Sequence, residues 1–146
     1  MIEKQNITFQ LEASTQEEAI RRLVEKADEI GKVSDVEATV ETVLNREKEG
    51  TTGFGKGIAI PHGKSAGVAE PVLMFAKTEE NLEWNSMDGE PVEMIFLILV
   101  PEESHQEHLQ LLAKLARKLM HDDFVATLRE TSDAEQLTAF LEKELA

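Results

Sequence analysis

The stretch on which the fold of this chain depends is "PVEMIFLILVP", residues 91–101. It contains an unbroken apolar run from Met94 to Val100, with a proline at each end of the stretch. An apolar run of this length without polar alternation is typical of a central strand with both faces buried. We therefore predict a sheet at the centre of the protein, covered by other elements on both sides.

Three further stretches predict strands around this centre. "NITFQLEA" (6–13) alternates apolar and polar residues, while "GIAIP" (57–61) and "PVLMFAK" (71–77) are short apolar runs bounded by breakers. Because helical patterns precede and follow these strands, the sequence predicts a mixed sheet flanked by helices, an α/β (α+β) fold. No repeat or linker interrupts the chain, so we expect a single domain over residues 1–146.

Helix starts are indicated by a recurring S-x-x-E spacing, in which the serine caps the helix and the glutamate returns to the serine amide. The four occurrences begin at Ser14, Ser34, Ser104 and Ser132. Apolar residues at helical spacing then predict helices over about 14–30, 34–47 and 104–120, with one or two shorter helices after them. Gly31 is a suitable left-handed end for the first helix.

Composition limits the classes of function. The formal net charge is −14, from 15 Lys and Arg against 29 Asp and Glu, which argues against nucleic acid as a partner. A partner with a basic docking face fits better, the alternative being that the acidic surface serves solubility alone. The first ten residues do not resemble a signal peptide and the longest apolar run is too short to span a bilayer, so we expect a cytoplasmic protein without membrane insertion.

The stretch "GTTGFGKGIAIPHGKS" (50–65) is rich in glycine and ends in a histidine motif. A nucleotide-binding loop would lead into a helix, whereas these glycines precede a strand that Pro61 closes, so a nucleotide site fits poorly. The remaining interpretations are a tightly turned loop and a loop whose backbone amides approach an anion. Lys56 and Lys64 flank the site, either assisting it electrostatically or simply solvated.

His62 lies between Pro61 and Gly63, at the predicted end of a strand. Proline restricts the backbone and glycine leaves space beside the ring, so the imidazole is held in place and still within reach of a large partner. This setting suits a nucleophile. The alternative is a loop histidine without a role.

Two more residues are candidates for binding a phosphoryl group. His108 lies one turn into the helix that begins near Ser104, where the helix dipole disfavours a protonated ring and favours a nearby anion. The Arg46 guanidinium can hold two phosphoryl oxygens, although an arginine near the end of an amphipathic helix usually points into water. His105 and His121 are expected at solvated surface positions.

These residues resemble a known family. The pattern Glu47, six residues, Phe54-Gly55, two residues and 58–63, "IAIPHG", is similar to the active-site signature of the fructose- and mannitol-type enzyme IIA domains of the bacterial sugar phosphotransferase system. The later "MDGEPVEMIFLILVPEESHQEHLQLLAKLARKLM" (87–120) resembles the same family, so the similarity covers nearly the whole chain.

The resemblance implies a phosphocarrier domain with a phosphohistidine intermediate. The histidine of the "IPHG" motif, here His62, is expected to accept a phosphoryl group from the carrier protein HPr and to pass it to a cysteine of the IIB component. The family's second active-site histidine falls on His108 and its arginine on Arg46. This chain has no cysteine, which fits the lack of a fused IIB domain.

The loop residues Thr52, Gly53 and Gly55 are expected to surround the phosphate. No metal or nucleotide cofactor is expected, because the donor is itself a phosphohistidine. A metal site formed by His62, His105, His108 and nearby acidic residues is a competing interpretation, since two histidines three residues apart on a helix can share a metal.

The sugar is predicted to be fructose, because "EWNSMDGEPVEMIFLILVPE" (83–102) looks more similar to fructose-type than to mannitol-type domains. The alternative is a regulatory IIA of the nitrogen-related branch, which keeps the histidine and acts by binding other proteins.

Overall fold

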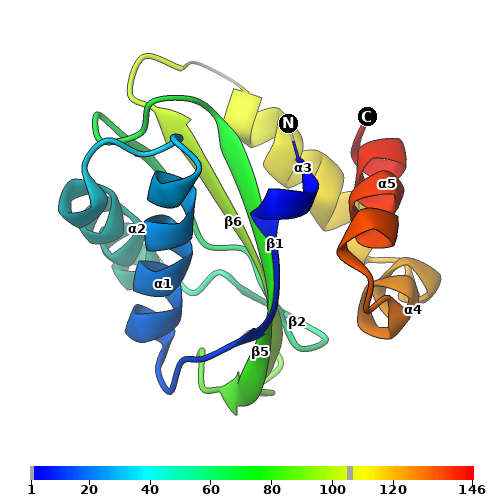
Figure 1. Ribbon diagram of the computed structural model, residues 1–146. Helices are drawn as coiled ribbons and strands as arrows, with labels where there is room; N and C mark the ends of the chain where they lie inside the picture. Colours follow the sequence, from blue (N-terminus) through cyan, green and yellow to red (C-terminus); the bar gives the residue numbers. More distant parts are fainter. Residues whose placement is uncertain (1, 105–106) are drawn as a thin grey trace.

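The computed structural model describes residues 2–104 and 107–146, and a mixed sheet lies at its centre (Figure 1). The strands are β1 (Ile7–Leu11), β2 (Gly53–Gly55), β3 (Ile58–Ala59), β4 (His62–Ser65), β5 (Val72–Leu82) and β6 (Val92–Pro101). Their order is β1-β5-β6-β3-β2, and β4 also pairs with β6. β5 and β2 run antiparallel to their neighbours β6 and β3, whereas β1 pairs with β5 in parallel, as β3 and β4 do with β6. The expected mixed sheet is confirmed.

Strand β6 is the buried centre of this sheet, as its apolar run predicts. Every residue from Met94 to Pro101 is buried. Met94, Phe96 and Ile98 belong to the hydrophobic cluster on one face, while residues at the alternate positions 95, 97 and 99 belong to the cluster on the other. A strand that faces a core on both sides has no polar face, which explains the missing alternation.

β3 and β4 are two parts of one line of chain along β6. Ala59 lies opposite Ile95 and His62 lies opposite Ile98, so the register is unchanged across the gap. Pro61 interrupts the ladder because it has no amide to donate, but its carbonyl still accepts a hydrogen bond of 3.1 Å from the Ile98 amide. This arrangement places His62 at the first position of β4.

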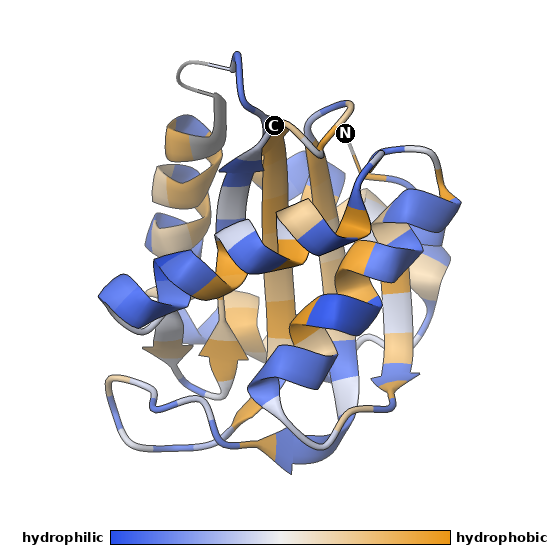
Figure 2. Cartoon of the chain, turned by 90° about the vertical axis from the view of Figure 1, so that its left-hand side faces the viewer, coloured by the Kyte–Doolittle hydropathy of each residue, from blue (hydrophilic) through white to orange (hydrophobic). Residues whose placement is uncertain are grey.

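Helices cover both faces of the sheet. They are α1 (Gln16–Glu29), α2 (Val36–Glu49), α3 (Glu107–Leu119), α4 (Asp122–Glu130) and α5 (Ala134–Leu145), with a short 3₁₀ turn η1 (Lys4–Asn6) before β1. α1 and α2 lie on one face and α3, α4 and α5 on the other (Figure 1). Viewed from the side of α1 and α2, hydrophobic bands on these helices lie over central strands that are mostly hydrophobic (Figure 2). Within the described ranges, none of the helices is long and apolar enough to cross a membrane.

The helix starts differ from the prediction by one residue. The residues that cap α1, α2 and α5 are Thr15, Asp35 and Asp133, each directly after the serine of the S-x-x-E pattern. The serine and the residue directly after it are both good N-capping residues, so local sequence does not choose between them. At α2 a tertiary contact decides, because the Ser34 hydroxyl donates to the Gly67 carbonyl instead. The fourth pattern includes residues outside the described ranges, while Gly31 has the expected positive φ, 81°.

Candidate functional site

His62 is half-buried at the start of β4, and its ring is oriented by its own main chain. The Nδ1 atom lies 3.0 Å from the carbonyl oxygen of Ile60. A carbonyl oxygen only accepts hydrogen bonds, so Nδ1 is the donor. In a neutral ring with its proton on Nδ1, the lone pair is on Nε2, which is therefore the nucleophilic nitrogen.

Ile60 is itself fixed by a second contact. Its amide donates a 3.0 Å hydrogen bond to the carbonyl of Thr52, across the open end of the β2–β3 hairpin. The following Pro61 restricts Ile60 to extended backbone conformations. The carbonyl that holds the His62 ring is therefore part of a braced segment.

Helix α2 packs directly on the strand beside His62. A β-carbon at Gly63 would lie 2.9 Å from Val43 Cγ2 and 3.3 Å from Thr42 Cγ2, so glycine at this position allows the helix to approach β4. This corrects the expectation that Gly63 leaves space for a partner beside the ring, because α2 occupies that space. The close approach also brings the next turn of α2, with Arg46, toward His62.

Arg46 and His62 line the same open pocket, of about 350 Å³. Its lining residues are Thr42, Asn45, Arg46, Glu49, His62, Gly63 and Lys64. The Arg46 Nη1 atom donates a 2.8 Å hydrogen bond to the Gly50 carbonyl, which anchors the guanidinium, and this group has further N–H donors of the kind that bind an anion. Lys64 is exposed at the rim and adds a second positive charge. The pocket can thus hold an anionic group beside the nucleophilic ring.

The three loop residues expected around the phosphate lie in other surroundings. The lining of the His62 pocket, as far as the structure describes it, includes none of them. The Thr52 amide donates a hydrogen bond to Glu47 of α2. Gly53 lies so close to Ser86 that a β-carbon would be 2.5 Å from the serine hydroxyl. Gly55, with φ 110°, faces Asp88. Their role around a phosphate remains a prediction.

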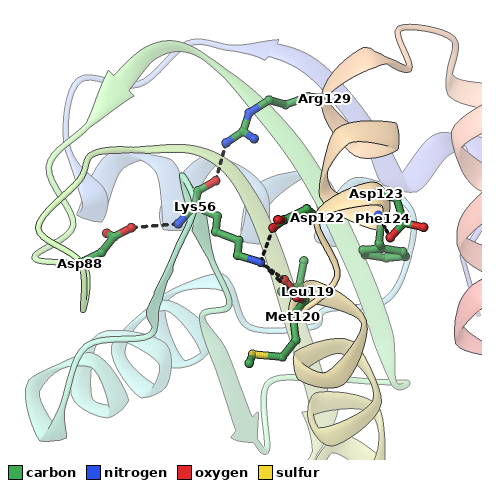
Figure 3. A network of polar contacts seen from close by, with 8 residues as sticks. All are labelled: Lys56, Asp88, Leu119, Met120, Asp122, Asp123, Phe124 and Arg129. Atoms are coloured by element: carbon green, nitrogen blue, oxygen red, sulfur yellow. Dashed lines mark hydrogen bonds and ion pairs between the residues drawn. The ribbon is translucent and has the colours of Figure 1, made fainter.

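Lys56 belongs to a network on the side of α3 and α4 (Figure 3). Its amide donates to Asp88 at 3.0 Å, and the Arg129 guanidinium donates to its carbonyl. Its ammonium contacts three oxygen atoms where α3 ends and α4 begins: Leu119 O at 3.0 Å, Met120 O at 3.3 Å and Asp122 Oδ1 at 3.0 Å. Lys56 is therefore not simply solvated, because it ties the glycine hairpin (the β2–β3 hairpin, residues 53–59) to the end of α3. Electrostatic assistance by Lys56 stays a prediction.

The other three histidines differ in how far the structure describes them. His108 is the second residue of α3, in agreement with its expected place in the first turn, but its side chain lies outside the described part of the chain. His105 lies outside it altogether. His121 is exposed before α4, which confirms its expected surface position. Among the described residues no group of three His, Asp or Glu side chains could hold a metal, and the His62–His105–His108 alternative is left to metal analysis of the protein.

Glu47 is a contact residue to which the sequence assigned no role beyond its place in the signature. Its carboxylate accepts hydrogen bonds from the Thr52 amide at 3.1 Å, from the Thr52 hydroxyl, and from Gln16 Nε2 at 3.3 Å. The indole nitrogen of Trp84 lies 3.4 Å from the same Thr52 hydroxyl. The place of Glu47 in the signature that this chain resembles, ahead of the "IPHG" motif, is the one signal in the sequence that could have indicated it.

Comparison with known proteins finds a family and relatives that match nearly the whole chain. The family model described as "Phosphoenolpyruvate-dependent sugar phosphotransferase system, EIIA 2" matches residues 1–144. The fructose-specific EIIA component of the phosphotransferase system of Haloferax volcanii is 39% identical over 129 residues, 88% of this chain and 84% of that protein.

Two solved structures are similar over nearly the whole chain. The nitrogen regulatory protein IIA-Ntr from Neisseria meningitidis has a TM-score of 0.86 and 33% identity, covering 95% of this chain and 94% of that one. Enzyme IIA for mannitol from Escherichia coli, in complex with phosphorylated enzyme IIB for mannitol, has a TM-score of 0.79 and 25% identity, covering 99% and 96%.

Proposed function

Because this chain belongs to the EIIA 2 family of the phosphoenolpyruvate-dependent sugar phosphotransferase system, we propose that it carries a phosphoryl group on His62. The donor is phospho-HPr, and the acceptor is a cysteine of the cognate IIB component. This transfer supports uptake and phosphorylation of fructose. The observation that carries the proposal is the hydrogen bond from His62 Nδ1 to the Ile60 carbonyl, since it directs the lone pair of the neutral ring to Nε2.

The chemistry needs positioning and charge stabilisation rather than a cofactor. Nε2 of His62 attacks the phosphorus as the bond between phosphorus and the donor histidine breaks, so one nitrogen–phosphorus bond replaces another. Nδ1 keeps its proton and its hydrogen bond to Ile60 throughout. Arg46, which lines the same pocket, stabilises the negative charge on the phosphoryl oxygens.

His108 assists the onward transfer in this proposal. It lies in the first turn of α3, where the positive end of the helix dipole favours an anion. We expect a His108→Ala protein to accept phosphate from phospho-HPr and to pass it to IIB slowly. Unchanged onward transfer would remove His108 from the mechanism.

The direct experiment is incubation with phosphoenolpyruvate, enzyme I and HPr. The wild-type protein should gain one acid-labile phosphate, and His62→Ala should gain none. A label that persists in His62→Ala would contradict the assignment of the acceptor. We also propose a cytoplasmic location, where these partners reside.

The second candidate is regulation by phosphorylation-dependent binding of other proteins, which the similarity to the nitrogen regulatory protein of Neisseria meningitidis favours. Phosphotransfer assays against separate candidate IIB domains distinguish the two. Rapid transfer to a fructose-type IIB supports transport, whereas a phosphorylated protein that transfers to none of them supports regulation.

A further inference from the structure

We propose that Glu47 is a positioning residue for His62, acting through Thr52 and Ile60. The inference rests on the proposed function of His62 as the phosphoryl acceptor. Nothing in the chemistry requires Glu47 to touch the phosphoryl group, and it is not among the described residues that line the His62 pocket. Its effect is on the tautomer and orientation of the ring.

An unbroken series of hydrogen bonds joins the two side chains. The Thr52 amide and hydroxyl donate to the Glu47 carboxylate, the amide at 3.1 Å. The Thr52 carbonyl accepts from the Ile60 amide at 3.0 Å. The Ile60 carbonyl accepts from His62 Nδ1 at 3.0 Å. Each residue in the series is thus fixed at both its amide and its carbonyl, or at its side chain, before the ring is reached.

The position of Glu47 is unfavourable for a carboxylate in isolation. It lies in the last turn of α2 (Val36–Glu49), where the negative end of the helix dipole repels an anion. Donors from Thr52 and Gln16 compensate for this repulsion. A residue that opposes a local rule and is compensated by contacts from two other segments is a candidate for a functional constraint.

The helix that carries Glu47 also carries Arg46. Arg46 lines the His62 pocket, while the adjacent Glu47 holds the segment that orients the His62 ring. One turn of α2 therefore positions both the guanidinium that can bind the anion and the segment that orients the nucleophilic ring. Movement of the hairpin relative to α2 would separate them.

The first measurement is the tautomer of His62, read from the nitrogen chemical shifts of its ring in the unphosphorylated protein. The wild-type ring should carry its neutral-state proton on Nδ1. In Glu47→Gln, and in Thr52→Val, which removes the hydroxyl donor, the Nδ1–H form should lose its dominance. A residue that served only the stability of α2 would leave this ratio unchanged.

The second measurement is the rate of phosphorylation by phospho-HPr. We expect kcat to fall about tenfold in Glu47→Gln, with little change in the KM for HPr. A loss of this size is found when a metal-binding histidine loses the hydrogen-bond partner that orients its ring. Glu41→Gln, which removes an exposed charge from the same helix, is the matched control and should behave like the wild type.

The inference is overturned if Glu47→Gln and Thr52→Val keep the wild-type tautomer ratio and rates within twofold. It is also overturned if Glu41→Gln reproduces their effects, because then only the charge of the helix matters. A wild-type protein that accepts no phosphate would reject the proposed function, while the tautomer measurement would still decide whether Glu47 orients the ring.

Discussion

Val43 packs on the main chain of Gly63 so closely that a β-carbon there would lie 2.9 Å from Val43 Cγ2. This contact fixes the distance between α2 and the strand that begins with His62. Since Arg46 lies one turn further along the same helix, a single glycine determines how the cation and the nucleophile face each other.

Gly63→Ala should separate α2 from β4. The added methyl group meets Val43 and Thr42, and such overpacking costs about 1–3 kcal/mol of unfolding free energy. Urea unfolding measures the loss, and phosphorylation by phospho-HPr should slow as Arg46 moves. Gly50→Ala is the matched control, because no atom lies within 4 Å of a β-carbon at that position. Equal losses in the two variants would rule out the packing explanation.

Arg46→Lys should slow phosphorylation of His62 while leaving the fold intact. Lysine keeps the charge but loses the planar fork that can bond to the Gly50 carbonyl and to phosphoryl oxygens at once. Loss of one such donor costs about 10²-fold in rate where the donor faces developing charge. Single-turnover transfer from phospho-HPr gives the rate. Arg22→Lys, on the surface of α1, should have no effect, and a wild-type rate in Arg46→Lys would show that charge alone suffices.

Lys56→Met should destabilise the junction of the glycine hairpin with α3. The ammonium contacts two carbonyls at the end of α3 and the Asp122 carboxylate, and we expect its loss to cost about 1 kcal/mol. Urea unfolding of Lys56→Met and of Lys48→Met, an exposed lysine on α2, makes the comparison. A cost as large in Lys48→Met would mean that the contacts of Lys56 contribute nothing specific.

Asp88→Asn should show a stability difference that depends on pH. Hydrogen bonds from the amides of Glu90 and Lys56 hold the pKa of the Asp88 carboxyl below its usual value of 3.8. A lowered folded-state pKa stabilises the fold above the unfolded-state pKa, and this stabilisation is lost as the pH falls through the folded-state value.

The melting temperature of Asp88→Asn should therefore lie below that of the wild type at pH 7, and the two should converge at pH values under about 3.8. Asp28→Asn, which changes an exposed aspartate in α1, serves as the control. A difference between wild type and Asp88→Asn that is constant from pH 7 to pH 3 would contradict the mechanism.

The sequence predicted the elements that carry a long apolar run or a periodic apolar pattern. The run from Met94 to Val100 indicated the central strand, and the helical spacing of apolar residues indicated the helices on both faces. It did not predict β2 (Gly53–Gly55) or β4 (His62–Ser65), because these short strands consist largely of glycine and polar residues. They are strands through pairing with β3 and β6, a tertiary cause that propensity does not contain.

For the candidate site, the "IPHG" motif pointed to His62 and the resemblance pointed to Arg46. The structure places these two residues in the same pocket, while their roles stay predictions. The partners of Lys56 could not be predicted, because they come from the β5–β6 connection and from the junction where α3 ends and α4 begins. The link from Glu47 to Thr52 depends equally on how the chain turns after α2.

Trp84 is the only tryptophan of the chain, and it is buried with its indole nitrogen 3.4 Å from the Thr52 hydroxyl. The emission of an indole responds to changes in its hydrogen bonding and polarity. The unlabelled protein therefore contains an optical probe at the junction of α2 with the glycine hairpin. A stopped-flow trace of this fluorescence during mixing with phospho-HPr would record the response of that junction in real time.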